Sequence, residues 1–183
     1  MAPKYVVFSI IATLGFVADQ ATKWWVANNL EVHTDEIVLI PKFMSIVHAQ
    51  NTGAAFSSLD GAWPLMFVFF ALVMSVAILD LLRRQAPTER AVPFALALII
   101  AGALGNGLDR ITRGHVVDMI KNYAGFEPAK SWFIEQFRTN VWPIYNIADS
   151  MLLIGVAAFL LYFLFQGESE PQGDDLTTPP GPG

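Results

Sequence analysis

Long apolar runs separated by shorter polar segments dominate the pattern of this 183-residue chain. Four runs, at about 5–26, 63–82, 92–108 and 145–165, contain few charged residues. At about 1.5 Å per residue, helices of this length approach the roughly 30 Å thickness of a bilayer core. The pattern therefore predicts a mainly α-helical membrane protein with four transmembrane helices.

The first apolar run also allows a different interpretation, a cleaved signal peptide that begins near Lys4. Cleavage needs small residues after the run, and Phe16-Val17-Ala18 has a bulky residue where a small one is needed. The pair Trp24-Trp25 is typical of a membrane interface. We therefore expect this run to be retained as the first transmembrane helix.

The segment 30–60 differs in character from the apolar runs. It carries more charge, and its two β-rich stretches, 37–40 and 43–48, are too short to cross a membrane. Pro41 lies between them. The two stretches are predicted to form a small strand pair outside the hydrocarbon region.

The connection 111–143 is long, rich in aromatic residues, and predicted to form a lid loop. Within it, Trp132, Phe133 and Phe137 would share one face of a short helix lying in the membrane interface. The alternative is that these aromatic side chains cap a loop. We expect residues 1–166 to form a single domain and residues 167–183 to form a disordered tail.

The number of spans decides which polar residues can meet. With four spans, the C-terminal ends of the first and third and the N-terminal end of the fourth lie on the same face of the membrane. A shared site near that interface is therefore predicted for the polar residues Asp19, Lys23, Asn51, Asn106, Asp109, Arg110, Asp118, Asn146 and Asp149.

The distribution of basic residues bears on the orientation of the chain. Lys4 and the arginines of the turn 83–90 lie on the opposite face, and the positive-inside rule would place them, with both termini, in the cytoplasm. The connection that follows Arg110 is also basic, so a total count does not decide the orientation. The density of charge in the short turn favours cytoplasmic termini.

Composition removes several classes of function. Hydrophobic residues make up 54% of the chain and charged residues only 15%, which is less charge than a soluble domain carries. Cysteine is absent, which excludes disulfides, thiolate metal sites and a cysteine nucleophile. The net charge of −5 offers no basic surface for nucleic acid. No phosphate-binding loop or His-Glu-x-x-His zinc motif occurs, so no metal site and no cofactor are expected.

The remaining candidates for chemistry are carboxylates at membrane depth, where ionisable groups are costly and usually functional. Two carboxyl groups in close contact share a proton, so one can activate water while the other polarises a carbonyl group. Asp118 with Asp149 is a plausible pair of this kind, and so is Asp109 with either. The alternative is that some of these acids only form ion pairs with Arg110 or Lys23, and this interpretation is favoured for Asp109 and Asp19.

Five short motifs resemble, in order, the successive motifs of the bacterial lipoprotein signal peptidase family, also called signal peptidase II. The resemblance runs from about residue 5 to 165, and the motifs are Asp19-Gln20-Ala21-Thr22-Lys23, Asn51-Thr52-Gly53-Ala54-Ala55-Phe56-Ser57, Gly102-Ala103-Leu104-Gly105-Asn106 with Asp109-Arg110, Gly114-His115-Val116-Val117-Asp118, and Tyr145-Asn146-Ile147-Ala148-Asp149-Ser150. The resemblance implies an aspartic intramembrane protease of the inner membrane. Such a protease removes the signal peptide of diacylglyceryl-modified prolipoproteins just before the lipidated cysteine.

By the same resemblance, Asp118 and Asp149 are the catalytic pair. The resemblance implies that the substrate pocket is lined by Asn51, Gly53, Asn106, Arg110 and Asn146, and that Asp19, Lys23 and Asp109 support the structure. It also implies a β-cradle on the outer membrane surface, a mobile periplasmic helix within 120–140 and an active site near the periplasmic face. The expected partners are prolipoprotein substrates and membrane lipids, and the expected state is a monomer.

Two rival functions use the same features. A small proton-coupled transporter also carries intramembrane carboxylates and arginines, but it would place them near the midplane and show internal repeats. Here the polar residues crowd one interface and no repeat is evident. A non-catalytic membrane partner protein with four spans is the third possibility.

Overall fold

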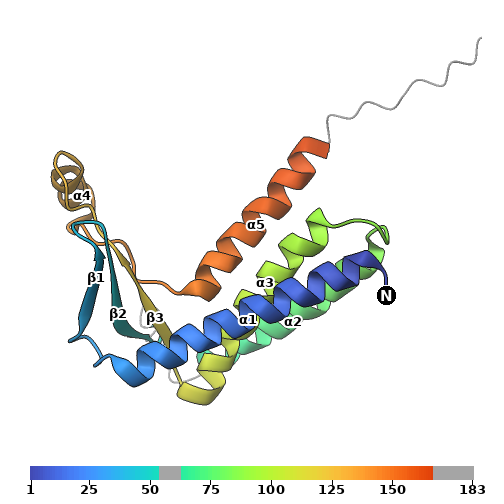
Figure 1. Ribbon diagram of the computed structural model, residues 1–183, viewed down its shortest axis with the longest axis horizontal. Coiled ribbons are helices and arrows are strands. Elements are labelled where there is room, and N and C mark those ends of the chain that lie inside the picture. The colour runs from blue at the N-terminus through green and yellow to red at the C-terminus, as the bar shows by residue number, and fades with distance from the viewer. Residues whose placement is uncertain (54–62, 167–183) are drawn as a thin grey trace, which may run out of the picture.

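The computed structural model describes residues 1–53 and 63–166. Figure 1 shows the described chain, which forms, in order, α1 (Pro3–Asn29), β1 (Glu36–Ile40), β2 (Met44–Asn51), α2 (Trp63–Arg84), α3 (Ala91–Arg113), β3 (Val116–Asn122), α4 (Ala129–Phe137) and α5 (Ile147–Gln166). The predicted tail 167–183 and the last part of the predicted cradle, 54–60, lie outside the described residues.

The predicted mainly helical membrane fold is confirmed in its general form. Within the described residues, three helices are long and apolar enough to cross a bilayer: Pro3–Asn29, Ala91–Arg113 and Ile147–Phe165. The second predicted span, 63–82, forms the 22-residue helix α2. Helix α3 runs five residues beyond the predicted end at 108, so Asp109 and Arg110 belong to its last turns.

Helix α3 is the centre of the helical part, because it packs against α1, α2 and α5. Small residues allow this close packing. A Cβ atom at Gly102 would overlap the carbonyl oxygen of Ala148 on α5, and one at Gly105 would overlap a carboxylate oxygen of Asp19 on α1. Because α3 has no bulk at these positions, the polar ends of α1 and α5 come together beside it.

A three-stranded antiparallel sheet lies at one end of the helices, together with α4 (Figure 1). Strand β2 is central, and it pairs with β3 so that Asn51 lies opposite Val116 and Ala49 opposite Asp118. The strands β1 and β2 confirm the β-rich character predicted for 37–40 and 43–48. Val26 at the end of α1 packs against Val117 of β3 and anchors the sheet to the helices.

The stretch 111–143 differs from the predicted lid loop. It contains the end of α3, the strand β3 and the helix α4, so Asp118 lies on a strand and the sheet is not confined to 30–60. The polar residues Asp118 and Lys121 interrupt the apolar pattern of β3, and backbone pairing with the distant strand β2 and with Tyr145 holds it extended. Helix α4 agrees with the predicted short aromatic helix: Trp132, Phe133 and Phe137 contact one another on it.

The other end of the helices is tied together by hydrogen bonds to the turn between α2 and α3. Lys4 is buried and donates to the carbonyl oxygens of Arg83 and Gln85 at 2.8 and 2.6 Å. Tyr162 donates to Glu89 at 2.9 Å. These contacts join the start of α1 and the end of α5 to the turn, at the end of the helices opposite the sheet (Figure 1).

Candidate active site

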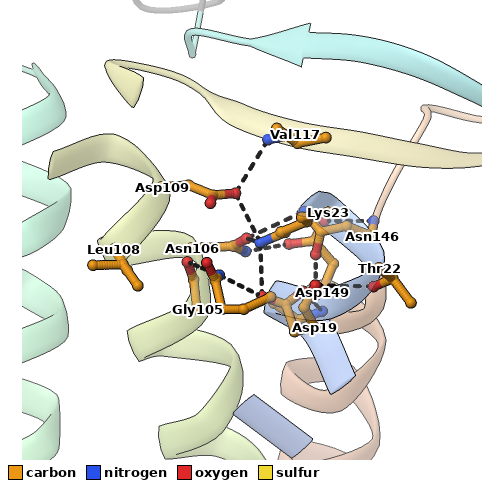
Figure 2. Close-up of polar contacts among 12 residues, drawn as sticks. Asp19, Thr22, Lys23, Gly105, Asn106, Leu108, Asp109, Val117, Asn146 and Asp149 are labelled. Atoms are coloured by element: carbon orange, nitrogen blue, oxygen red, sulfur yellow. Dashed lines mark hydrogen bonds and ion pairs between the residues drawn. The ribbon is translucent and has the colours of Figure 1, made fainter. Parts of the chain in front are cut away.

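The ends of α1, α3 and α5 and the beginning of β3 meet in a buried polar cluster (Figure 2). The structure thus brings together most of the residues predicted to share a site. Those with side chains in the cluster's hydrogen bonds and ion pairs are Asp19, Lys23, Asn51, Asn106, Asp109, Asp118, Asn146 and Asp149.

Lys23 is the cation at the centre of this cluster. Its Nζ lies 2.9 Å from Asp19 Oδ2 and 3.0 Å from Asp109 Oδ2, and all three side chains are fully buried. Asp109 also pairs with Arg113 one turn further along α3. Two anions and two cations therefore balance one another, which is the condition for burying charge. The ion-pair interpretation of Asp19 and Asp109 fits this arrangement, with Arg113 in place of Arg110.

The same two carboxylates also hold backbone groups of other elements. Asp19 Oδ1 accepts a hydrogen bond from the backbone nitrogen of Ala148 at 3.0 Å, which ties α1 to the start of α5. Asp109 Oδ2 accepts one from the backbone nitrogen of Val117 at 3.2 Å, which ties α3 to β3. Sequence reasoning missed these partners because a backbone amide has no side-chain signature. The ion pair of Asp109 with Arg113 could have been predicted, because residues four apart share one face of a helix.

Asn106 connects this ionic group to Asp149. Its Oδ1 accepts from Lys23 at 2.8 Å and from Asn146 at 3.1 Å. Its Nδ2 is then directed to Asp149 Oδ1, at 2.7 Å. Because a lysine ammonium group can only donate, the orientation of the Asn106 amide follows from its partners. The donor side of Asn106 therefore faces the carboxylate of Asp149.

Asn146 links Asp149 to Asp118. It precedes α5 as its N-cap: its Oδ1 accepts from the backbone nitrogen of Asp149 at 3.0 Å, and its own backbone nitrogen donates to Asp149 Oδ2 at 3.2 Å. This reciprocal pattern is a capping box with aspartate at the third helical position. Its Nδ2 donates to Asp118 Oδ1 at 2.7 Å. One asparagine thus fixes two carboxylates relative to each other.

Asp118 is buried on β3, with 3% of its surface exposed. Its second oxygen accepts a hydrogen bond from Asn51 Nδ2 at 3.0 Å. Burial raises the pKa of Asp118 from 3.8 to about 6; the charge of Asp149 adds to the rise, while the hydrogen bonds from Asn51 and Asn146 and the charge of Lys23 oppose it. A carboxyl group in this environment exchanges protons close to neutral pH.

Two further predicted residues lie at the edge of the cluster. The backbone N–H of Gly53 donates a hydrogen bond to Asn51 Oδ1 at 2.9 Å. Gly53 has a φ of 74°, which glycine adopts without steric cost. Arg110 donates to the carbonyl oxygen of Asn106 at 3.1 Å, and its guanidinium group interacts electrostatically with Asp149 and Asp118. Among the described residues, no group of His, Cys, Asp or Glu side chains is arranged to hold a metal ion.

A groove of about 790 Å³ opens beside Asp149, between the start of α5 and the segment that follows β3. Its described lining is mostly apolar and includes Phe43, Phe126, Phe133, Trp142, Leu153 and Ile154. Polar side chains in the lining include Asn122, Tyr145 and Ser150. Large apolar grooves with a few placed polar groups are typical of ligand sites.

Comparisons with known proteins show similarity over most of the chain. Residues 11–165 match the family described as signal peptidase (SPase) II. The lipoprotein signal peptidase of Shouchella clausii is 36% identical over 161 residues, which cover 88% of this chain and 95% of that protein. The protein of the same name from Geobacter metallireducens is also 36% identical, over 88% of this chain and 92% of its own length.

Two solved structures of bacterial membrane enzymes share the fold. One superposes with a TM-score of 0.74 at 29% identity and covers 91% of this chain and 93% of its own. The other gives a TM-score of 0.72 at 31% identity, over 86% of this chain and 92% of its own. By its sequence match and its fold, this chain belongs to the signal peptidase II family.

Proposed function

We propose that this chain is an aspartic endopeptidase that removes the signal peptide from diacylglyceryl-modified prolipoproteins, with Asp118 and Asp149 as its catalytic pair. Its relatives are named lipoprotein signal peptidases, and the chain matches nearly their whole length. The observation that carries the assignment of the pair is the double role of Asn146. Its side chain donates to Asp118 and also caps the helix that carries Asp149.

The proton shared by the pair is assigned to Asp118. Burial and the charge of Asp149 raise the pKa of Asp118 to about 6. Asp149 instead accepts hydrogen bonds from the Asn106 amide and the Asn146 backbone, and it lies in the first turn of α5, where the helix dipole favours negative charge. Asp149 is therefore the base and Asp118 the acid at the start of the reaction.

Hydrolysis then needs no metal and no covalent intermediate. Asp149 takes a proton from water, and the resulting hydroxide equivalent attacks the scissile carbonyl carbon while Asp118 transfers its proton to the carbonyl oxygen. A tetrahedral intermediate forms. Asp149 then returns its proton to the leaving nitrogen, the C–N bond breaks, and Asp118 recovers its proton as the new carboxyl group forms. The pair ends in the protonation state in which it began.

The other predicted site residues hold this pair in place. Asn51, Asn106 and Asn146 supply amide donors to the two carboxylates, and Gly53 forms the turn that orients Asn51. Asp19, Lys23 and Asp109 support them as a buried ionic group. Arg110 lines the substrate pocket and stabilises negative charge on the pair, because its guanidinium group interacts electrostatically with Asp149 and Asp118.

In the proposed membrane arrangement, α2 is the fourth span of an inner-membrane protein whose domain is residues 1–166. Residues that α2 directs away from the other helices are large and apolar, with exposed fractions between 47% and 70%: Phe69, Phe70, Leu72, Val73, Met74 and Val76. Such a surface suits lipid and not water. The positive-inside rule orients Lys4, Arg83 and Arg84, with both termini, toward the cytoplasm, so the active site lies near the periplasmic face. The protein acts as a monomer among membrane lipids.

A proton-coupled transporter is less well supported. Asp149 lies in the first turn of α5 and Asp118 on the strand β3, and the relatives of the chain are named as lipoprotein signal peptidases. A transporter would place its carboxylates on a pathway near the midplane. A proton-flux measurement in liposomes separates the two functions, because the peptidase gives no flux.

The direct test is cleavage of a diacylglyceryl-modified prolipoprotein by the purified protein in detergent. Asp118→Asn and Asp149→Asn are each expected to lower kcat by about 1000-fold or more, because each removes one partner of the acid–base pair. Asp80→Asn is the matched control, since Asp80 forms an exposed ion pair with Arg84 at 2.8 Å. Retained cleavage by either of the first two variants would refute the catalytic assignment.

A further inference from the structure

The groove beside Asp149 contains a pair of polar side chains that the chemistry above does not use. Tyr145 donates its hydroxyl hydrogen to Asn122 Oδ1 at 2.8 Å. Both side chains line the groove and are half-buried, and they lie among aromatic and aliphatic residues. In a mostly apolar pocket, a few placed polar groups fix the orientation of a ligand.

The hydrogen bond from Tyr145 decides which way the Asn122 amide points. Because the hydroxyl group donates to Oδ1, the amide nitrogen is directed to the other side, toward the carbonyl oxygen of Phe43. The distance from Nδ2 to that oxygen is 3.4 Å, at the long limit of a hydrogen bond. An amide nitrogen carries two hydrogens, so Asn122 keeps donor capacity for an incoming acceptor.

The backbone of Tyr145 fixes the position of this pair relative to the two aspartates. The carbonyl oxygen of Tyr145 accepts from the backbone nitrogens of Met119 and Ile120 at 3.0 and 2.7 Å, and its nitrogen donates to Ile120 at 3.1 Å. Tyr145 thus joins the strand residue that follows Asp118 to the cap of the helix that carries Asp149. A group bound at Asn122 has a defined position relative to both carboxylates.

We infer that Asn122 donates a hydrogen bond to a backbone carbonyl oxygen of the substrate peptide, and that Tyr145 is the positioning residue that orients the Asn122 amide for this contact. A peptide bound in an apolar groove has to pair its carbonyl groups, because an unpaired buried carbonyl is costly. The inference rests on the proposed function for the identity of the ligand as a peptide, and it adds a binding subsite to the catalytic pair.

The experiment compares kcat and KM for a synthetic peptide that contains a diacylglyceryl-cysteine and the preceding signal-peptide residues. The variants are Tyr145→Phe, Asn122→Ala, Asn122→Asp and the double variant Tyr145→Phe/Asn122→Ala. Asn122→Asp keeps the acceptor for Tyr145 but lacks the donor. Tyr162→Phe is the matched control, because it removes a hydroxyl hydrogen bond of 2.9 Å near the far end of α5, the helix that begins two residues after Tyr145. Binding of a fluorescent form of the peptide is measured separately in an Asp118→Asn background.

A neutral hydrogen bond is worth about 0.5–1.5 kcal/mol, which corresponds to roughly two- to thirteenfold in affinity. The three single variants in the subsite are expected to raise both KM and Kd by this factor, with kcat within about twofold of wild type. The double variant is expected to match Asn122→Ala, since Tyr145 acts through Asn122. Tyr162→Phe is expected to behave as wild type.

Unchanged KM and Kd for Asn122→Ala, additive effects in the double variant, or an equal effect of Tyr162→Phe would each overturn the inference. The two proposals fail separately. Wild type that binds the peptide without cleaving it refutes the proposed function, and the Kd series still decides the role of Asn122. Wild type that cleaves, with subsite variants of unchanged KM and Kd, refutes the role of Asn122 alone. Wild type that neither binds nor cleaves the peptide refutes both.

Discussion

Lys23 Nζ lies 2.8 Å from Asn106 Oδ1, and this contact orients the amide that meets the proposed catalytic carboxylate. An ammonium group has three donors and no acceptor, so it must face the oxygen of the amide. The nitrogen of Asn106 is then left to donate to Asp149, at 2.7 Å. The buried cation thereby influences Asp149 through a single neutral side chain.

Substitution of Asn106 tests this arrangement. Asn106→Asp keeps the shape of the side chain and still accepts from Lys23, but it cannot donate to Asp149 in its ionised form. A hydrogen bond to a charged group is worth about 1.5–3 kcal/mol, so kcat is expected to fall by roughly 10- to 150-fold. The measurement is peptide cleavage by the purified variant. Asn28→Asp is the control, because Asn28 is exposed and donates only to its own helix; a kcat for Asn106→Asp within threefold of wild type would contradict the prediction.

Removal of the Lys23 charge is expected to affect folding before activity. Lys23→Met leaves Asp19 and Asp109 as buried carboxylates that have lost their shared cation, a change that typically costs about 3–5 kcal/mol. The variant should accumulate poorly and melt at a lower temperature. An additional Asp19→Asn substitution should restore part of the stability, because Asp109 keeps its ion pair with Arg113 while Asp19 has lost the ion pair that it forms with Lys23.

Lys121→Met provides the matched control for Lys23→Met. Lys121 also forms an ion pair, with Glu36 at 3.0 Å, but both side chains of this pair are partly exposed. Exposed pairs contribute about 0–1 kcal/mol. A loss of stability in Lys121→Met equal to that in Lys23→Met would show that burial of the charge is not the cause.

The pKa of Asp118 predicts a dependence of stability on pH. In the folded protein the pKa of Asp118 is about 6, whereas the ordinary pKa of an aspartate, which applies to the unfolded chain, is 3.8. The folded state therefore holds more protons between these values, and the free energy of unfolding falls as the pH rises through this window. The difference between the two pKa values corresponds to about 3 kcal/mol of the free energy of unfolding, and this contribution is lost by pH 7.

Asp118→Asn removes the titratable carboxyl group, so a comparison of this variant with wild type isolates the contribution of Asp118 to the pH dependence. The melting temperature of Asp118→Asn minus that of wild type should increase between pH 4 and pH 7, and this difference should then remain constant. Thermal unfolding in detergent at several pH values measures the difference, with Asp80→Asn as an exposed control. A difference between Asp118→Asn and wild type that does not change with pH would show that Asp118 titrates in the same range when folded and unfolded.

Two glycines on α3 are expected to respond to alanine in opposite directions. A Cβ atom at Gly102 would overlap the backbone oxygen of Ala148, which cannot move away without displacing α5. Overpacking of this kind costs about 1–3 kcal/mol, and displacement of α5 also moves Asp149. Gly102→Ala should therefore lower both the melting temperature and kcat.

At Gly107, the nearest atom to an added Cβ is the Cβ of Ala71, at an ordinary contact distance of 4.0 Å. Alanine is the better helix former by about 0.5–1 kcal/mol, so Gly107→Ala should raise the melting temperature with little change in kcat. The same assays serve both variants. A stabilising Gly102→Ala would contradict the proposed close approach of α3 and α5.

The local pattern of apolar residues was sufficient to predict the long helices of this protein. The length of each apolar run predicted a helix, because runs of about 20 apolar residues bury their backbone hydrogen bonds most simply in that form. The order of the runs also predicted that Asp19, Asn106 and Asp149 lie at the same membrane face. These three side chains do meet, since helix direction alternates whatever the detailed packing.

Tertiary structure decided how the polar residues pair and where Asp118 lies. Strand β3 forms by pairing with β2, which is more than 60 residues earlier in the chain, and no local pattern contains that contact. Likewise, Lys23 pairs with Asp109 and orients Asn106 only because α1 and α3 approach closely at Gly105. Residue types and spacing identified the acids and allowed the pair of Asp19 with Lys23 within one helix, but contacts between elements depend on distances that are set by packing.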